Sequence, residues 1–202
     1  MYNLNKKEMN ILKKLNSPAK IQDFINKLKT NFEEKGETCM SPRIVLREKK
    51  AHCIEAAFLA HLAFKINNMD SWVVDLKGND WDHVICIFKK EGFGCISKSN
   101  HAAHRYREPI YRDVRELVMS MFHEYIDDNG NKTLREFSEM VDLSVFGEEW
   151  VTDEKELWWL NDALEGLKHF PILSKEQENN LRKADKIEIE AGKITEYQKI
   201  DL

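Results

Sequence analysis

The segment from Cys53 to Ile66 constrains the fold of this chain more than any other. Its sequence, CIEAAFLAHLAFKI, places apolar residues such as Ile54 and Phe58 around most of the circumference of a helix. A helix that is apolar on nearly every side has to be enclosed by other elements. Lys50 and His52, directly before it, are polar. The sequence therefore predicts a central buried helix whose first turn lies near a surface or cleft.

Three short runs with β character follow this helix. They are WVVDL at 72–76, HVICIF at 83–88 and FGCIS at 93–97. The turn-forming sequences KGND and KKEG separate them and are short enough for antiparallel hairpins. A central buried helix packed on a small antiparallel sheet is an α+β arrangement, and we expect that fold class.

Helical patterns flank this core on both sides. They cover 4–15, 17–32, 113–126 and 152–167. Ser17-Pro18 supplies an N-cap and a first-turn proline for the second of them. Near the end of the chain, residues 184–200 alternate apolar and polar side chains around Ala191-Gly192, which predicts a hairpin.

The length of 202 residues fits one domain with elaborations. We expect a single domain over 1–202, with a core at about 38–112, a helical elaboration at about 113–180 and a tail hairpin at 184–200.

Charge and cysteine content restrict the environment and the partners. The net charge of −4 gives no general attraction to nucleic acid or to an anionic membrane. No apolar run is long and uninterrupted enough for a signal peptide or a membrane span. The thiols are therefore expected to be reduced and the protein cytoplasmic. The four cysteines are Cys39, Cys53, Cys86 and Cys95.

Cys53 and His83 form the candidate reactive pair. A thiol is a useful nucleophile only as a thiolate, which both a helix N-terminus and a nearby imidazole favour. Cys53 begins the buried helix, and His83 begins the second β run. A strand packed against the helix would bring the two side chains together.

This order of residues resembles the transglutaminase-like superfamily of papain-type cysteine enzymes. The strings that carry the resemblance include KAHCIEAA, DHVICIF, GFGCISKSNHA and YREPIYR, and the likeness covers roughly residues 17–170. ISKSNHA and YREPIYR indicate a bacterial or archaeal branch of the superfamily. The resemblance implies that Cys53 is the nucleophile and His83 the general base and acid.

The third catalytic position departs from the family pattern. Family members typically have an aspartate four residues after an aromatic residue, and the same count from Phe93 reaches Ser97. A serine hydroxyl can fix the tautomer of an imidazole but supplies no charge. Asn100 is an alternative orienting residue. Asp82 adjoins His83, but successive residues in a strand point to opposite faces.

A second departure lies before the nucleophile, where Ala51 replaces a glycine that many relatives have. The predicted chemistry is acyl transfer, or hydrolysis of an amide or ester, with a peptide, a protein amide or a small amide or ester as substrate. It requires no cofactor and no metal. The alternative is a non-catalytic binding protein that has lost the third residue of the triad.

Other patterns allow competing interpretations. His83, Cys86, Cys95 and Cys53 together could ligate zinc, although Cys86 and His83 are expected on opposite faces of a strand. The segment YIDDNGNKTLRE at 125–136 resembles a calcium loop, but Tyr125 occupies its first ligand position.

The segment HAAHRYREPIYR at 101–112 gathers histidine, arginine and tyrosine side chains. It could bind a carboxylate or phosphate, or its arginines could pair with neighbouring acids. The remaining histidines have no site-like spacing. Of these, His52 is expected at the rim of the site and the others in structural or surface positions; they are His61, His123 and His169.

Overall fold

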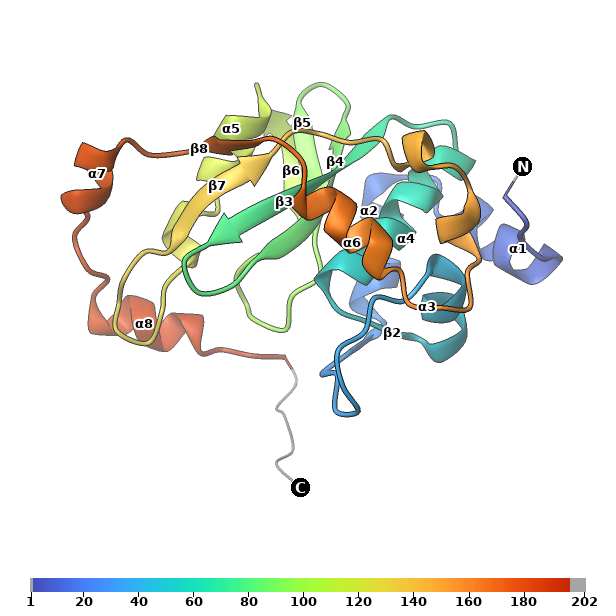
Figure 1. The fold of residues 1–202 in the computed structure, drawn as a ribbon, viewed down its shortest axis with the longest axis horizontal. Helices are drawn as coiled ribbons and strands as arrows, with labels where there is room; N and C mark the ends of the chain where they lie inside the picture. The colour runs from blue at the N-terminus through green and yellow to red at the C-terminus, as the bar shows by residue number, and fades with distance from the viewer. Residues whose placement is uncertain (1, 197–202) are drawn as a thin grey trace.

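The computed structural model describes residues 2–196 and has an α+β fold (Figure 1). Its main sheet is antiparallel, with six strands in the order β6-β5-β4-β3-β7-β8. A separate parallel pair is formed by β1 and β2. The α-helices are α1 (Lys6–Lys14), α2 (Pro18–Asn26), α3 (Pro42–Glu48), α4 (Cys53–Ile66), α5 (Val114–Met119), α6 (Trp158–Glu165), α7 (Lys175–Asn179) and α8 (Lys186–Gly192). The strands are β1 (Lys29–Thr30), β2 (Lys50–Ala51), β3 (Ser71–Gly78), β4 (His83–Lys89), β5 (Phe93–Ile96), β6 (Arg107–Tyr111), β7 (Leu134–Ser138) and β8 (His169–Pro171). Three 3-10 helices are η1 (Phe122–Glu124), η2 (Leu143–Phe146) and η3 (Glu149–Val151).

The central helix α4 is enclosed as its composition predicts. Every residue from Ile54 to Phe64 is buried, and α1, α2 and α3 pack around α4 on the side away from the sheet (Figure 1). The start of α2 also agrees with the prediction, because the Ser17 side chain caps the helix and Pro18 is its first residue. The remaining side of α4 lies on β3 and β4.

The two faces of the sheet belong to different hydrophobic clusters. Val84, Cys86 and Phe88 of β4 pack into the cluster that contains α4. Ile85 and Ile87 point to the opposite face, where α5 and η1 cover them. This alternation is the period of two that a strand imposes on its side chains. The sheet is therefore buried on both faces at β4, the strand that begins with His83.

The C-terminal half differs from the predicted helical elaboration. The expected helix at 113–126 ends at Met119, and the expected helix at 152–167 is shortened to α6. Two strands of the sheet also lie within 113–180, because β7 pairs with the edge of β3 and β8 pairs with β7. An exposed edge of β3 would leave backbone groups unpaired, and this long-range pairing satisfies them. The sheet is consequently larger than the small sheet expected.

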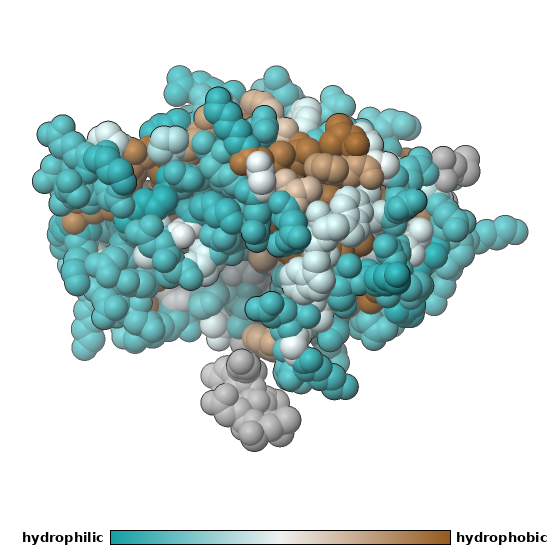
Figure 2. Space-filling view, in the orientation of Figure 1, coloured by the Kyte–Doolittle hydropathy of each residue, from teal (hydrophilic) through white to brown (hydrophobic). Residues whose placement is uncertain are grey.

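The predicted tail hairpin at 184–200 is wrong for residues 186–192, which form α8. Glu188 accepts a hydrogen bond of 2.6 Å from the backbone N–H of Asp185, and this capping contact favours a helical start over the alternating pattern. Residues 197–200 lie outside the described residues. No helix in the described part of the chain is long and apolar enough to cross a membrane. Figure 2 shows a largely hydrophilic face with an apolar area in its upper half.

Candidate functional site

Cys53 is the first residue of α4 and is partly exposed. The preceding strand β2 pairs with β1, which fixes how the chain approaches the helix. His52 has extended backbone geometry and is the N-cap residue. Backbone N–H groups at a helix start lack intrahelical partners and carry partial positive charge. The Cys53 sulfur therefore lies where an anion is stabilised.

His83 is buried at the start of β4, and its ring is oriented by Ser97. Its Nε2 atom lies 2.8 Å from Ser97 Oγ, and Ser97 Oγ lies 2.5 Å from the carbonyl oxygen of His104. A carbonyl oxygen only accepts, so the Ser97 hydroxyl proton points to His104 and Ser97 accepts from His83 Nε2–H. In the neutral imidazole this leaves the lone pair on Nδ1 of His83.

The Cys53 thiol interacts with two histidines. Burial raises its pKa, but hydrogen bonds from His52 and then His83 outweigh this effect, and the pKa of Cys53 is lowered to about 5. The structure thus brings together the three residues predicted from the sequence, Cys53, His83 and Ser97. It also adds His52, which was expected only at the rim.

Ser97 is held by a side chain from a distant part of the chain. Gln22 of α2 donates from Nε2 to the Ser97 carbonyl oxygen at 2.8 Å, and it accepts from the Ser97 N–H at 3.1 Å. Both residues are buried. The clamp fixes the chain directly after β5, where the hydroxyl meets His83. Gln22 was not recognised from the sequence because nothing in its local pattern links it to Ser97.

The two alternatives to Ser97 lie elsewhere. The Asp82 carboxylate contacts Lys77 Nζ at 2.7 Å and the N–H of Gly78 at 3.2 Å, so it turns toward β3. Asn100 is in the following loop, where its carbonyl oxygen accepts from the N–H of Glu196 at 2.8 Å. Of Ser97, Asp82 and Asn100, it is Ser97 whose side chain hydrogen-bonds to the His83 ring.

His52 is surrounded by acceptors. Its Nδ1 atom is 4.0 Å from the Cys53 sulfur. Its Nε2 atom is 2.9 Å from the Thr38 carbonyl oxygen, 3.3 Å from Glu55 Oε1 and 3.6 Å from Glu33 Oε1. Burial lowers the pKa of His52, but hydrogen bonds to Cys53 and Glu55 reverse this and raise it to about 11. This imidazole is held in its charged form.

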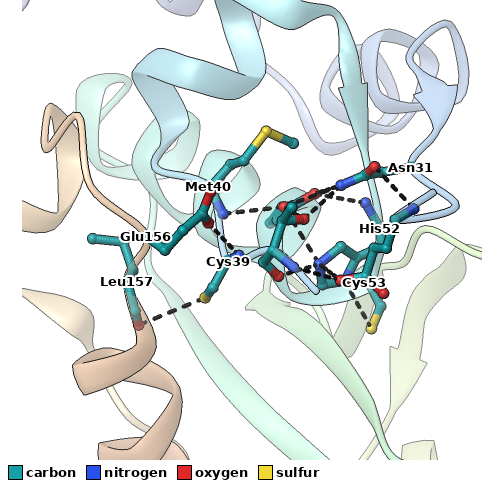
Figure 3. Close-up of polar contacts among 10 residues, drawn as sticks. Asn31, Cys39, Met40, His52, Cys53, Glu156 and Leu157 are labelled. Atoms are coloured by element: carbon teal, nitrogen blue, oxygen red, sulfur yellow. Dashed lines mark hydrogen bonds and ion pairs between the residues drawn. The ribbon is translucent and has the colours of Figure 1, made fainter. Parts of the chain in front are cut away.

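Glu55 is a fully buried carboxylate in the first turn of α4. It accepts from Thr38 Oγ1 at 2.8 Å, from the N–H of His52 at 2.9 Å, from the N–H of Met40 at 3.0 Å and from Asn31 Nδ2 at 3.2 Å. Burial raises its pKa, but the contacts with His52 and the hydrogen bonds lower it overall. Figure 3 shows Asn31 and His52 on one side of this cluster and Met40 and Cys39 on the other.

An aromatic cluster packs against His83. The rings of Trp81 and Tyr125 are stacked with their centroids 4.3 Å apart. Trp81 also makes T-shaped contacts with His104 and His83, with ring centroids 4.8 Å and 6.1 Å apart. His104 is buried, and neither of its ring nitrogens has a hydrogen-bond partner among residues 2–196. Burial lowers the pKa of His104 to about 2, so this ring is neutral.

A pocket of about 150 Å³ opens beside the Cys53 sulfur. It lies between the start of α4, the α4-facing side of β3 and β4, and α6. Its charged lining consists of Asp75, Asp82, Glu165 and Lys77, with His52 at its edge. A small substrate group could reach the sulfur through this pocket.

The other cysteines are buried. Cys86 and Cys95 lie on adjacent strands but in clusters on opposite faces of the sheet. Burial raises the pKa of Cys95, and likewise that of Cys39, to about 12. The four side chains of the zinc alternative therefore do not converge on one point.

The arginines of 101–112 are engaged by acids, as the structural interpretation of that segment requires. Arg107 contacts Glu124 at 2.6 Å, Arg105 contacts Glu196 at 3.1 Å and Arg112 contacts Glu116 at 3.1 Å. Glu116 is one of the neighbouring acids expected as partners, whereas Glu124 and Glu196 lie farther along the chain and were not indicated by the local sequence. The calcium-loop segment forms a turn in which Asp127 accepts from the N–H groups of Asn129 and Asn131.

No protein-family model matches the chain, and no curated protein sequence matches it. Its function therefore has to be inferred from the residues of the site.

Proposed function

We propose that the chain is a transglutaminase-like cysteine enzyme that transfers or hydrolyses acyl groups through a thioester on Cys53. The observation that carries the proposal is the convergence of three features on one sulfur atom. Cys53 begins a buried helix, His83 together with His52 lowers the pKa of its thiol, and His83 is fixed by Ser97. The helix-and-sheet core also agrees with the fold that the family resemblance implies.

The reaction begins with the Cys53 proton on His83. The thiolate attacks the carbonyl carbon of an amide or ester, and the C–S bond forms as the carbonyl π electrons move to oxygen. Backbone N–H groups of the first turn of α4, which have no intrahelical acceptor, stabilise this oxyanion. His83 Nδ1–H then protonates the leaving amine or alcohol as its bond to carbon breaks. The products of this half-reaction are a thioester and neutral His83.

The second half-reaction restores the enzyme. His83 Nδ1 accepts a proton from water or an amine as that nucleophile attacks the thioester carbonyl. The tetrahedral intermediate collapses and the C–S bond breaks, which returns the thiolate and the imidazolium. Ser97 accepts from Nε2–H throughout and leaves Nδ1 as the ring nitrogen that exchanges protons. A neutral serine supplies orientation without charge, which is compatible with a slower enzyme than one that has an aspartate.

The test is direct detection of the acyl-enzyme. The protein is incubated with p-nitrophenyl acetate and with a glutamine-containing peptide, and the modified residue is located by mass spectrometry. Acetylation of Cys53 and release of ammonia from the peptide are expected. Cys53→Ala should abolish both, whereas Cys86→Ala should leave both unchanged. His83→Ala should reduce ammonia release by about 10²-fold or more, because the leaving amine loses its proton donor.

The non-catalytic alternative makes the opposite prediction. If Cys53 stays unmodified by the ester while the protein is folded, and no amide is turned over, acyl transfer is excluded. The pocket beside Cys53 would then serve only for binding.

A further inference from the structure

The two histidines that contact Cys53 have different electrostatic surroundings. His52 Nε2 faces the carboxylates of Glu55 and Glu33, at 3.3 Å and 3.6 Å. His83 Nε2 faces the hydroxyl of Ser97, and within residues 2–196 no carboxylate makes an ion pair with it. An imidazolium is stabilised by adjacent negative charge far more than by a neutral hydroxyl. The cationic form is therefore favoured at His52.

Glu55 is suited to hold that charge because it cannot readily become neutral or turn away. It is fully buried, and its oxygens receive hydrogen bonds from Thr38, Met40, Asn31 and the backbone of His52. Donors to a carboxylate stabilise its ionised form. A buried carboxylate that lacks a nearby cation is costly, and His52 provides that cation.

Other ionisable groups near the sulfur do not supply a positive charge to it. Tyr125 and Cys39 have pKa values raised by burial, so both are neutral. On the pocket side, the carboxylates of Asp75 and Asp82 share the Lys77 ammonium at 3.1 Å and 2.7 Å. The cation next to the sulfur is therefore a histidine.

We propose that the Glu55–His52 pair is the fixed charge partner of the Cys53 thiolate, and that His83 is thereby left to carry protons through the reaction. The pair supplies the electrostatic contribution that Ser97, standing in the position of the usual aspartate, cannot make. His52 is a positioning and charge-balancing residue in this scheme, and His83 is the catalytic acid and base. The proposal rests on the proposed function of Cys53.

Stabilising the thiolate and transferring protons, two roles that one histidine usually combines, are divided here between His52 and His83. After His83 has given its proton to the leaving group, the His52 cation remains 4.0 Å from the Cys53 sulfur and stabilises the thiolate that the second half-reaction returns. The ionisation of Cys53 should then depend more on His52 than on His83, whereas proton transfer should depend on His83.

The experiment measures the pH midpoint of Cys53 alkylation by iodoacetamide, with mass spectrometry to count modification at that residue alone. The full-length wild type, His52→Ala, Glu55→Gln and His83→Ala are compared. We expect a wild-type midpoint near 5, a small upward shift in His83→Ala, and a larger shift toward the ordinary thiol value of about 8.5 in His52→Ala and Glu55→Gln. A Glu33→Gln variant, altered at a partly exposed carboxylate, should show a smaller upward shift and serves if the buried substitutions prevent folding.

The outcomes distinguish the role of the Glu55–His52 pair from acyl transfer by Cys53. If His83→Ala loses the low midpoint while His52→Ala and Glu33→Gln keep it, the charge partner is His83 and our inference is wrong, although acyl transfer by Cys53 would still stand. A wild-type midpoint near 8.5 would overturn the inference regardless of the acylation result. Acyl-enzyme formation on Cys53 is read separately and tests the function itself.

Discussion

The Nε2 atom of His83 donates a hydrogen bond of 2.8 Å to the Ser97 hydroxyl, which in turn donates to the carbonyl oxygen of His104. The direction of this chain is fixed because the carbonyl can only accept. Ser97 therefore holds one tautomer of the neutral His83 ring. It acts through hydrogen bonding alone, which makes the hydroxyl its essential feature.

Replacing Ser97 with alanine should reduce catalysis and stability together. The substitution leaves the His83 N–H and the His104 carbonyl without their buried partner, which costs about 1–3 kcal/mol in the free energy of unfolding. Loss of ring orientation should lower kcat at least about tenfold. Ser97→Thr retains the hydroxyl and is the matched control. Urea unfolding and amide turnover measure the two effects, and wild-type turnover in Ser97→Ala would show that Ser97 does not orient His83.

An aspartate at position 97 should not improve this enzyme. The Ser97 hydroxyl donates to the His104 carbonyl at 2.5 Å, and an ionised carboxylate has no proton to donate there. Two acceptors would face each other in a buried site, so Ser97→Asp should unfold at lower urea concentration than the wild type at pH 7. Ser97→Asn, whose amide can donate, should be less affected. Equal or greater stability in Ser97→Asp would contradict the assigned direction of the bond.

The Gln22 clamp should affect turnover more than substrate binding. Gln22→Ala removes both hydrogen bonds to the Ser97 backbone and loosens the segment that holds His83. We expect kcat to fall severalfold with KM nearly constant, because Gln22 is remote from the pocket beside Cys53. Asn26→Ala, which removes a neighbour of Gln22 without touching Ser97, provides a comparison. A change confined to KM would exclude a role in orienting His83.

Glu55 should stabilise the fold in a pH-dependent way. Its pKa is lowered in the folded state by His52 and by hydrogen bonds. The stabilisation is therefore present above the unfolded-state pKa of about 4.3 and is lost as the pH falls through the lower folded-state pKa. Glu55→Gln should lower the free energy of unfolding by about 3 kcal/mol at pH 7 and by less at pH 3. Urea unfolding at both pH values measures the difference, and a pH-independent loss would mean that the carboxylate charge is unimportant.

His104 should make the protein sensitive to mild acid. Its folded-state pKa of about 2 lies below the ordinary histidine value of about 6.5, so below that pH the unfolded chain takes up a proton that the folded chain does not. Stability contributed by the neutral ring is thus lost as the pH falls below about 6.5. His104→Phe removes the two ring nitrogens that lack partners among residues 2–196, and with them the group that takes up a proton. Its Tm relative to wild type should rise between pH 7 and pH 5, and a constant difference would refute this role.

Local patterns were sufficient for the parts of the fold that depend on nearby residues. The enclosure of α4 follows from an apolar composition around the whole helix, and the β3–β4–β5 hairpins follow from strand sequences with short turns. Strand β7 was missed because LREFS has no strict alternation and becomes a strand through pairing with β3 and β8. The capping contact at Asp185 likewise shows why the tail alternation did not produce a strand at 186–192.

By itself, the sequence determined the buried helix that begins at Cys53, the strand that begins at His83 and the placement of a hydroxyl at position 97. Tertiary structure decided which groups act on them. Gln22 meets Ser97 across 75 positions of sequence, and loops before α4 place Glu33, Thr38 and Asn31 around His52 and Glu55. Helix and strand periodicity are set by neighbouring residues, whereas the charge of a buried imidazole depends on acceptors that only the folded chain brings within hydrogen-bonding distance.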